Sequence, residues 1–383
     1  MGRIALVLGA GLGGMVAAQT LRRLLPESDR VVLVERQARH VFPPSLLWLM
    51  VGKRDAESIS RPSEHAARPG IEFVRGEVTA IDAAAKTVRV NGRTLHGDAL
   101  VIALGAEYAP QSIPGLAEGG LCIYTIEGAS AIRDALTRFE GGRLAVLTAA
   151  PQYKCPAAPY EAALLAESYL RERGRRTNAV IDFYAAEPGP MMVAGPKVSA
   201  GVRAMIEARG IVYHPEHQVK NMDAGARRIE FANGRSAAFD LLLYVPPHRA
   251  PEVVRAAGLT NDSGWIPVDR HSLATRYPGV YAIGDVAVIG LKMGRPLPKA
   301  GVFAHGQAEV VAHNIAREFT GRGAPRRFDG RGLCFVETGG NRAGMGSGNF
   351  YAEPLPEVRL RGPALLWHGA KVLYEKYWLW SRF

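Results

Sequence analysis

The first apolar stretch of the chain covers residues 3–8 and is followed at once by glycine. A run this short is typical of a buried parallel strand and not of a helix. A glycine-rich turn occupies 9–14, helical periodicity continues to about residue 25, and a second apolar run at 31–34 ends in Glu35. This order predicts a strand, a turn, a helix and a strand, which is the start of a dinucleotide-binding unit.

The same plan occurs again in the second half of the chain. Asn-Gly pairs at 91–92 and 233–234 each separate two short segments, a strong signal for a β-hairpin. An aspartate and an apolar run follow each pair at equal spacing, at 98–104 and at 240–245, and the run at 143–147 resembles the first strand. A repeat of this kind predicts two copies of one nucleotide-binding fold.

The predicted fold class is therefore α/β, with two tandem Rossmann-like dinucleotide-binding folds and a C-terminal segment. We expect a discontinuous first domain at 1–110 and 250–330, with a second nucleotide-like domain at 111–249 inserted into it. A long helix is expected at about 301–319, and the C-terminal segment covers 331–383.

Composition narrows the class of protein without deciding its chemistry. Apolar residues make up 48% and charged residues 22% of the 383 residues, as in an ordinary globular protein. The net charge of +11 favours anionic partners, such as an acidic substrate or an anionic membrane surface. The basic residues are scattered and no nucleic-acid motif occurs, so we expect no nucleic-acid partner.

No apolar stretch reaches the roughly 18 to 20 residues that a membrane-spanning helix needs. The N-terminal apolar run leads directly into the glycine turn and not into a cleavage site, so we expect no signal peptide. The three cysteines, Cys122, Cys155 and Cys334, are too few for a disulfide framework. Their spacing is not that of a zinc site, so we expect no metal, and a redox pair is left open.

The glycines of the first turn have distinct physical tasks. Gly9 permits the tight turn, Gly11 lets the backbone approach a pyrophosphate, and Gly14 lets the helix pack on the strand. The helix N-terminus then offers free N–H groups to the phosphates. Glu35 is expected to accept hydrogen bonds from the adenosine ribose.

The second copy lacks this turn. Matching residue 3 to residue 143 puts Ala149, Pro151 and Lys154 in the places of the three glycines, and matching the second strands puts Tyr184 in the place of Glu35. Proline and lysine do not adopt the glycine conformations that a pyrophosphate turn needs. We therefore expect that the second fold does not bind NADH.

A late Gly284-Asp285 pair favours FAD, since it ends an apolar strand and an aspartate there can bind a ribityl hydroxyl. With two nucleotide folds, the pattern resembles the FAD-dependent pyridine nucleotide–disulfide oxidoreductase superfamily over essentially the whole chain. The resemblance implies FAD. The cofactor-binding residues that we expect are Gly9, Gly11, Gly14, Glu35, Pro44, Gly105, Gly284, Asp285, Lys299 and Gly301.

A longer motif at 151–161, Pro-Gln-Tyr-Lys-Cys-Pro-Ala-Ala-Pro-Tyr-Glu, is far more specific. It is similar to the Lys-Cys-Pro-x-x-Pro-Tyr-Glu segment of the sulfide:quinone oxidoreductase and flavocytochrome c sulfide dehydrogenase family. The Gly-Leu-Cys sequence at 332–334 matches the context of a second family cysteine, and residues 44–45 and 298–301 also match.

This resemblance implies that Cys155 and Cys334 meet beside the flavin and carry out sulfur chemistry, with sulfide as substrate. Sulfur chemistry needs a thiolate, and we expect Lys154 to lower the thiol pKa. Glu161 is the expected general base or proton relay. The family's third cysteine would fall on Tyr124, so we expect a two-cysteine form, a structural Cys122 and non-covalent FAD.

The helix expected at 364–383 mixes Trp, Tyr and Leu with lysine, as interfacial helices do. It resembles the ending of sulfide:quinone oxidoreductases, which implies a peripheral, monotopic membrane protein with a quinone near Leu333, Lys376, Tyr377 and Trp378. Lys371 and Lys376 are expected to attract anionic lipid, and the helix is expected to carry no catalytic residue type. A docked core helix or a homo-oligomer interface is the alternative.

The function that these patterns predict is that of a sulfide:quinone oxidoreductase, in which two electrons pass through FAD to a membrane quinone. Three alternatives stay open. They are a type II NADH:quinone reductase, the sulfide-oxidising flavoprotein partner of a cytochrome, and a membrane-bound flavoprotein that acts on another thiol or persulfide.

Overall fold

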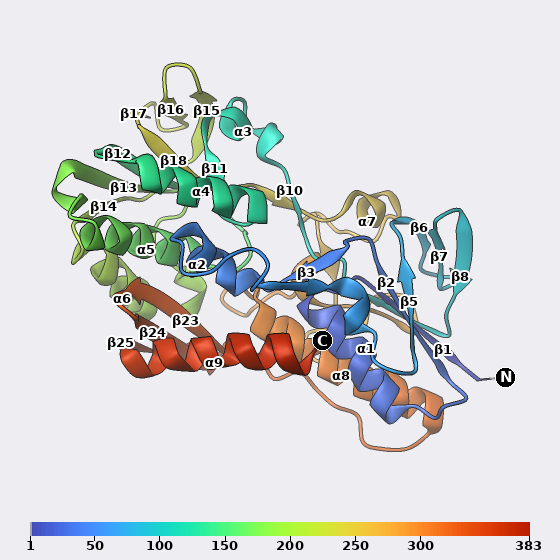
Figure 1. The fold of residues 1–383 in the computed structure, drawn as a ribbon. Coiled ribbons are helices and arrows are strands. Elements are labelled where there is room, and N and C mark those ends of the chain that lie inside the picture. Colours follow the sequence, from blue (N-terminus) through green and yellow to red (C-terminus); the bar gives the residue numbers. More distant parts are fainter. Residues whose placement is uncertain (1) are drawn as a thin grey trace.

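Two five-stranded parallel sheets, one toward each end of the molecule, dominate the structure, a computed structural model that describes residues 2–383 (Figure 1). The first sheet has the order β21-β9-β1-β2-β5 and the second the order β11-β18-β12-β13-β14. The predicted duplication is confirmed, because four strands correspond in both order and direction. The strands of the first sheet are β1 (Ile4–Leu8), β2 (Arg30–Glu35), β5 (Ile71–Arg75), β9 (Ala99–Ile102) and β21 (Val280–Ala282). Those of the second are β11 (Leu121–Cys122), β12 (Gly142–Thr148), β13 (Ala179–Ala185), β14 (Ile211–His214) and β18 (Leu241–Val245).

Each sheet is accompanied by a small antiparallel meander whose last two strands are joined by an Asn-Gly turn. Asn91 and Gly92 have φ angles of 51° and 76°, the left-handed conformation that a two-residue hairpin of this twist requires. The hairpin predicted there is therefore confirmed. The meanders consist of β6 (Val78–Asp82), β7 (Thr87–Val90) and β8 (Arg93–His96), and of β15 (Val219–Asp223), β16 (Arg228–Phe231) and β17 (Ser236–Ala238).

Helices cover the faces of both sheets, as the nearly continuous apolar strands require. Helix α1 (Leu12–Leu24) lies beside α8 (Gly301–Thr320) on the first sheet (Figure 1). A Cβ atom on Gly301 would lie 2.3 Å from Cδ1 of Leu12, so glycine allows this close approach. Helices α4 (Ile126–Arg138), α5 (Ala158–Glu172) and α6 (Pro196–Glu207) pack around the second sheet.

The C-terminal segment is a third layer. Strands β23 (Arg331–Gly339), β24 (Arg342–Asn349) and β25 (Glu357–Ala364) form an antiparallel sheet, and α9 (Leu365–Ser381) runs across it, red in Figure 1. The remaining short elements are β3 (Arg39–Val41), α2 (Leu46–Met50), β4 (Ser60–Pro62), β10 (Glu107–Tyr108), α3 (Leu116–Gly119), β19 (His248–Arg249), α7 (Glu252–Ala256), β20 (Ile266–Pro267) and β22 (Ala287–Val288).

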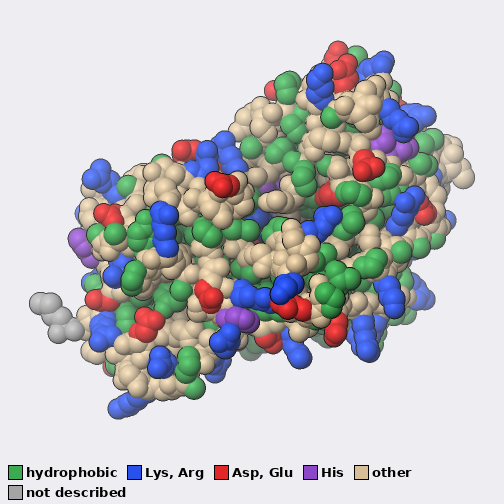
Figure 2. All heavy atoms as spheres, turned by 180° about the vertical axis from the view of Figure 1, so that it is seen from behind, with side chains coloured by type: hydrophobic (Ala, Val, Ile, Leu, Met, Phe, Trp, Pro, Cys, Tyr) green, Lys and Arg blue, Asp and Glu red, His purple; other side chains and the backbone are tan. Residues whose placement is uncertain are grey.

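Helix α9 buries charge and exposes apolar side chains, the reverse of an ordinary surface helix. Lys371 and Glu375 are 5% and 1% exposed, whereas Leu373 and Trp380 are 71% and 78% exposed. No helix within residues 2–383 combines the length and apolar character needed to cross a membrane. Basic side chains are spread over the face shown in Figure 2 and are not gathered into one patch.

Candidate functional site

The turn between β1 and α1 has the geometry that a pyrophosphate requires. Gly9 has a φ of 96°, and a Cβ atom on Gly14 would lie 1.8 Å from the carbonyl oxygen of Gly9. A Cβ atom on Gly11, in contrast, would meet no atom within 4 Å, so the space in front of the turn is open. Helix α1 begins directly after Gly11, and its free N–H groups lie at this space.

Glu35 lies at the end of β2, next to this turn. One carboxylate oxygen accepts a hydrogen bond of 2.7 Å from the backbone N–H of Ala10, and the other accepts one of 2.7 Å from that of Gln37. The acid predicted to bind the ribose is therefore beside the glycine turn. The open cradle and the adjacent carboxylate fit the adenosine diphosphate end of FAD.

The residues expected at the flavin end also come together. Gly284 has a φ of 71° and starts a single 3-10 turn that contains Asp285. The ammonium of Lys299 donates to the carbonyl oxygens of Asp285 and Ala287, at 2.6 and 2.9 Å. Burial lowers the pKa of Lys299 to about 8, although the charge of Asp285 opposes this. Gly105, just after β9, also has a positive φ and open space in front of it.

Cys155 is held against this region by its backbone. Its N–H donates to the carbonyl oxygen of Lys299 at 2.6 Å, and its own carbonyl accepts from Ala158 at 2.8 Å as α5 begins. The φ of Cys155 is 50°, a left-handed conformation that is strained for a residue with a side chain. A fixed, strained conformation of this kind is typical of functional loops.

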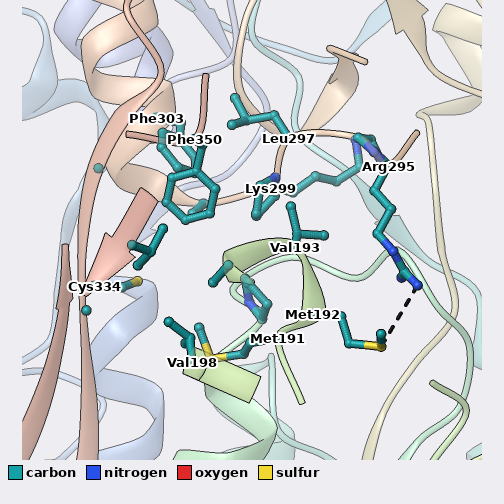
Figure 3. A pocket seen from close by; sticks show the side chains of 18 of the residues that line it. Met191, Met192, Val193, Val198, Arg295, Leu297, Lys299, Phe303, Cys334 and Phe350 are labelled. Atoms are coloured by element: carbon teal, nitrogen blue, oxygen red, sulfur yellow. Dashed lines mark hydrogen bonds between the residues drawn. The ribbon is translucent and has the colours of Figure 1, made fainter. Parts of the chain in front are cut away.

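Cys334 approaches from β23, and its sulfur points into a pocket of about 310 Å³ (Figure 3). Leu333, which precedes it, also lines the pocket. The walls are mostly apolar and include two thioethers, with Lys299 and Arg295 as the cations. The side chains that define the pocket include Met191, Met192, Val193, Leu297, Phe303 and Phe350.

The fold brings both cysteines to Glu161 and Lys371. All three cysteines are free thiols, and Cys155 and Cys334 are half-buried. Burial raises the pKa of Cys334 to about 11, and the charge of Glu161 adds to this while Lys371 opposes it. Burial also raises the pKa of Cys155, and so do the charges of Cys334 and Glu161. The lowered thiol pKa expected from the sequence is therefore not found, because desolvation outweighs the neighbouring cation.

Glu161 is buried in the first turn of α5. Its Oε2 atom accepts a hydrogen bond from the Nζ atom of Lys371 at 2.5 Å and another from the backbone N–H of Glu337 at 3.0 Å. Burial raises the pKa of the Glu161 carboxyl, although Lys371 counteracts it. A carboxyl group so placed has the chemistry of a general base for the two thiols.

Two expectations about the lysines need correction. Lys371 does not face lipid, because its ammonium is buried against Glu161, and α9 carries ionisable side chains on its buried face. Lys371 is the cation that mainly opposes the raised pKa values of Cys155 and Cys334, whereas Lys154 opposes that of Cys122. Lys154 lies over two tyrosine rings. Its ammonium lies 5.0 and 5.5 Å from the ring centres of Tyr108 and Tyr124. Sequence reasoning missed Lys371 because the helix that carries it has no local motif.

Tyr124, at the place of the family's third cysteine, supports the Cys155 loop. Its hydroxyl donates to the carbonyl oxygen of Lys154 at 2.5 Å. Cys122 lies on the short strand β11, pairs with Tyr244 of β18 and packs against the core of the second sheet. Burial raises the pKa of its thiol. This environment is that of a structural cysteine.

The register of the second fold differs by one residue from the sequence match. Asp98 accepts from the N–H of Ile4, and Asp240 accepts in the same way from the N–H of Arg143, both at 2.7 Å. Ile4 therefore corresponds to Arg143. The counterparts of the three glycines are then Thr148, Ala150 and Tyr153, and that of Glu35 is Ala185, not Tyr184.

The second turn is also much longer than the first. Helix α1 starts at Leu12, three residues after Gly9 (12 − 9), whereas α5 starts at Ala158, ten residues after Thr148 (158 − 148). The helix N-terminus that would bind a pyrophosphate has thus moved away, and the Cys155 loop fills the difference. The prediction that the second fold lacks the glycine turn is confirmed, and the longer loop takes the place of that turn.

The residues expected near a quinone divide into two environments. Lys376 and Tyr377 are exposed on α9, and Leu333 is 41% exposed. Trp378 is in the core, with its ring centre 6.1 Å from that of Phe42. Pro44 belongs to the turn before α2, and Ser45 beside it donates to Glu375 of α9 at 2.6 Å.

Residues 4–308 match the model of the pyridine nucleotide-disulphide oxidoreductase family, and the chain belongs to this family. It is an FAD-binding oxidoreductase.

Within the family, the chain is similar to the mitochondrial sulfide:quinone oxidoreductase of Mus musculus, with 25% identity over 365 positions, 91% of this chain and 79% of the relative. It is 28% identical to the sulfide-quinone reductase of Aquifex aeolicus over 401 aligned positions, 100% and 91% of the two chains. The crystal structure of the sulfide:quinone oxidoreductase of that bacterium superimposes with a TM-score of 0.88 at 26% identity, over 99% of this chain and 91% of the other. A demethylphylloquinone reductase of Synechocystis is 27% identical over 394 positions, 98% and 92% of the two chains.

Proposed function

We propose that this protein is a sulfide:quinone oxidoreductase that oxidises sulfide at Cys155 and Cys334 and passes two electrons through FAD to a membrane quinone. The observation that carries the proposal is that two thiols share the buried carboxyl of Glu161 as an electrostatic neighbour, Cys155 on the loop that takes the place of the second phosphate-binding turn and Cys334 on β23. The relatives named as sulfide:quinone oxidoreductases support the same substrate pair.

Two groups of residues would hold the two ends of FAD. Gly9, Gly11, Gly14 and Glu35 would hold its adenosine diphosphate end, and the segments at 284–285 and 299–301, with Pro44 and Gly105, its flavin end. When bound, FAD would supply a two-electron acceptor that can be reoxidised by quinone.

The sulfur step needs a disulfide between Cys155 and Cys334. Hydrosulfide attacks one sulfur, the S–S bond breaks, and a persulfide forms on one cysteine while the other becomes a thiolate. The electron pair of the broken bond stays on that thiolate. Since burial disfavours a thiolate here, Lys371 would stabilise the negative charge and Glu161 would take up the proton of H₂S.

The pocket beside Cys334 suits the product of this step. A persulfide on Cys334 would extend into a space walled by apolar groups and by the thioethers of Met191 and Met192, which are soft and polarisable. We infer that the pocket accommodates sulfur bound to Cys334.

The outward face of α9 is the proposed contact with a membrane. Leu366, Leu373, Tyr377 and Trp380 are all exposed and recur at helical spacing. An apolar face of this kind, with Lys376 beside it, suits the boundary between headgroups and acyl chains. Quinone would then enter near Leu333, Lys376 and Tyr377, and a homo-oligomer that covers this face is the alternative.

We also infer three structural units that follow the expected boundaries, with an FAD domain at 1–110 and 250–330, a second domain at 111–249 and a C-terminal segment at 331–383. The second unit would serve as a scaffold for the Cys155 loop and not as a nucleotide site.

Anaerobic mixing of the purified protein with sulfide tests the proposed function. Rapid loss of the oxidised flavin absorbance, followed by reoxidation on addition of a short-chain quinone, is the expected result. The rival is a type II NADH:quinone reductase. Flavin reduced by NADH and not by sulfide would replace the proposed function with that rival.

A further inference from the structure

The inner face of α9 carries three titratable side chains at helical spacing, His368, Lys371 and Glu375. Lys371 and Glu375 are buried, and the His368 side chain is 18% exposed. Burying such groups is costly unless each finds a partner of opposite charge. Because α9 buries these groups and exposes leucines instead, we expect the buried groups to have a function in the interior of the protein.

Two of these groups connect to the sulfur site. The Nδ1 atom of His368 lies 3.0 and 3.1 Å from the two carboxylate oxygens of Glu337 on β23. The backbone N–H of Glu337 donates to Glu161, which also binds Lys371 at 2.5 Å. The charge of Glu337 contributes to the raised pKa of Lys371, which places the two side chains near each other. His368 at the surface is thus linked through this cluster to the carboxyl group beside the two thiols.

The cluster pairs each of its two carboxyl groups with a basic side chain. Lys371 binds Glu161, and the imidazole of His368 lies against Glu337. Burial raises the pKa of Glu161, although Lys371 opposes this, so this carboxyl holds a proton more readily than an exposed one does.

The other charged groups near the cluster, Arg54 and Glu375, pair with each other. Arg54 donates to Glu375 with distances of 2.8 to 3.0 Å, so these two neutralise each other. The indole of Trp48 lies between the pairs, 4.9 Å from the Lys371 ammonium and 4.7 Å from the Arg54 guanidinium. Cys155 and Cys334 face the cluster from the sulfur side.

We propose that His368, Glu337 and Lys371 form a proton relay between Glu161 and the surface, and this proposal rests on the proposed function. Oxidation of H₂S to the level of zero-valent sulfur releases two electrons and two protons. The electrons leave through FAD to quinone, which takes up two protons elsewhere, and the protons of H₂S leave through Glu161. Lys371 and Glu337 make no ion pair with each other among the described residues, but the Lys371 ammonium and the Glu337 backbone N–H both donate to the same Oε2 atom of Glu161, so the three residues surround one oxygen.

His368 and Glu337 act through Glu161 and are positioning residues, whereas Lys371 also faces the two thiols. The test of the relay is sulfide-driven flavin reduction in the holoenzyme with His368→Gln, followed by stopped flow across pH 6 to 9 in H₂O and D₂O. We expect reduction about tenfold slower at neutral pH, because a positioned proton path contributes at least this much. We also expect a larger solvent isotope effect and partial recovery when free imidazole is added.

The matched control is Glu167→Gln on the same helix as Glu161. Glu167 is a fully buried carboxylate held by Arg171, Arg176 and Arg209, and these pairs do not include the cysteines. Its loss is expected to lower stability while the pH profile and isotope effect stay at the wild-type values.

The outcomes separate the two proposals. Wild-type flavin that sulfide fails to reduce overturns the proposed function and the relay with it. Wild-type flavin that is reduced, together with a His368→Gln protein of unchanged rate, pH profile and isotope effect, overturns the relay alone. The relay is also overturned if His368→Gln slows flavin reduction but imidazole does not restore the rate and the isotope effect is unchanged. The slower rate would then have a structural cause.

Discussion

Lys371 of the last helix and Glu161 of α5 form a buried ion pair of 2.5 Å although 210 positions separate them in the chain. The pair connects the C-terminal segment to the two thiols. A helix expected to act only at the surface therefore contributes to the interior of the site.

Replacing Lys371 with Met should destabilise the protein by about 3 to 5 kcal/mol, because it leaves Glu161 as an unpaired buried charge. Urea unfolding of the holoenzyme would measure this difference. Lys376→Met is the control, since that side chain is exposed on the same helix, and it should change the free energy of unfolding by no more than about 0.5 kcal/mol. Equal effects of the two changes would show that the ion pair contributes little.

Cys155→Ser and Cys334→Ser should each keep FAD and lose sulfide-driven flavin reduction, because each removes one sulfur of the proposed pair. Cys122→Ser should keep most of it, since Cys122 packs in the core of the second sheet. Flavin absorbance after acid precipitation measures retention and non-covalent binding, and stopped flow measures reduction. A Cys122→Ser protein as inactive as the other two would contradict the two-cysteine assignment.

The raised pKa of Cys334, about 11, gives a pH dependence with a definite sign. The folded protein holds the thiol proton more tightly than the unfolded chain, whose thiol titrates near pH 8.5. The resulting stability is complete below about pH 8.5 and is lost as pH rises toward 11. Iodoacetamide alkylation of Cys334, followed by mass spectrometry, should accelerate through the same range. Alkylation that is already complete at pH 7 within the same reaction time would show a lowered pKa instead.

NADH should reduce the flavin far more slowly than sulfide. The reason is the late start of α5, ten residues after Thr148, and the absence of glycine at the counterparts Thr148, Ala150 and Tyr153. Stopped-flow traces with each donor at sub-millimolar concentration would compare the rates. Similar rates would mean that the second fold binds NADH despite its long turn.

The membrane contact is best tested by changing only the outer face of α9. The double change Leu366→Glu and Leu373→Glu should abolish liposome flotation and slow quinone turnover, while FAD content and sulfide-driven reduction stay at the wild-type level. Both side chains are more than two-thirds exposed, at 68% and 71%. Leu24→Glu on α1 is the control for added charge. Deletion of the whole helix is expected to damage the sulfur site as well, since it removes Lys371.

Features encoded by neighbouring residues were predictable. The strand, glycine turn and helix at the N-terminus, the hairpin at Asn91 and the helix of α8 all follow from short-range sequence patterns. The motif that contains Cys155 and Glu161 is likewise local, so both residues could be named before their contacts were known.

The inner face of α9 could not be predicted, for a physical reason. His368, Lys371 and Glu375 form one polar stripe, and Leu366, Leu373 and Trp380 form an apolar stripe on the other side. Either stripe of such a helix can face inward, and the usual rule chooses the apolar one. Only the partners Glu161 of α5, Glu337 of β23 and Arg54 of the turn after α2 reverse that choice.

The length of the turn before α5 has a consequence for electron donors. In this chain the Cys155 loop fills the place in which the first fold has its helix N-terminus. Seven additional residues (10 − 3) form it, while the parallel sheet beneath keeps the strand order of the first fold. If the proposed function holds, one insertion in a loop exchanges a diffusible nucleotide donor for a tethered thiol without rebuilding the sheet.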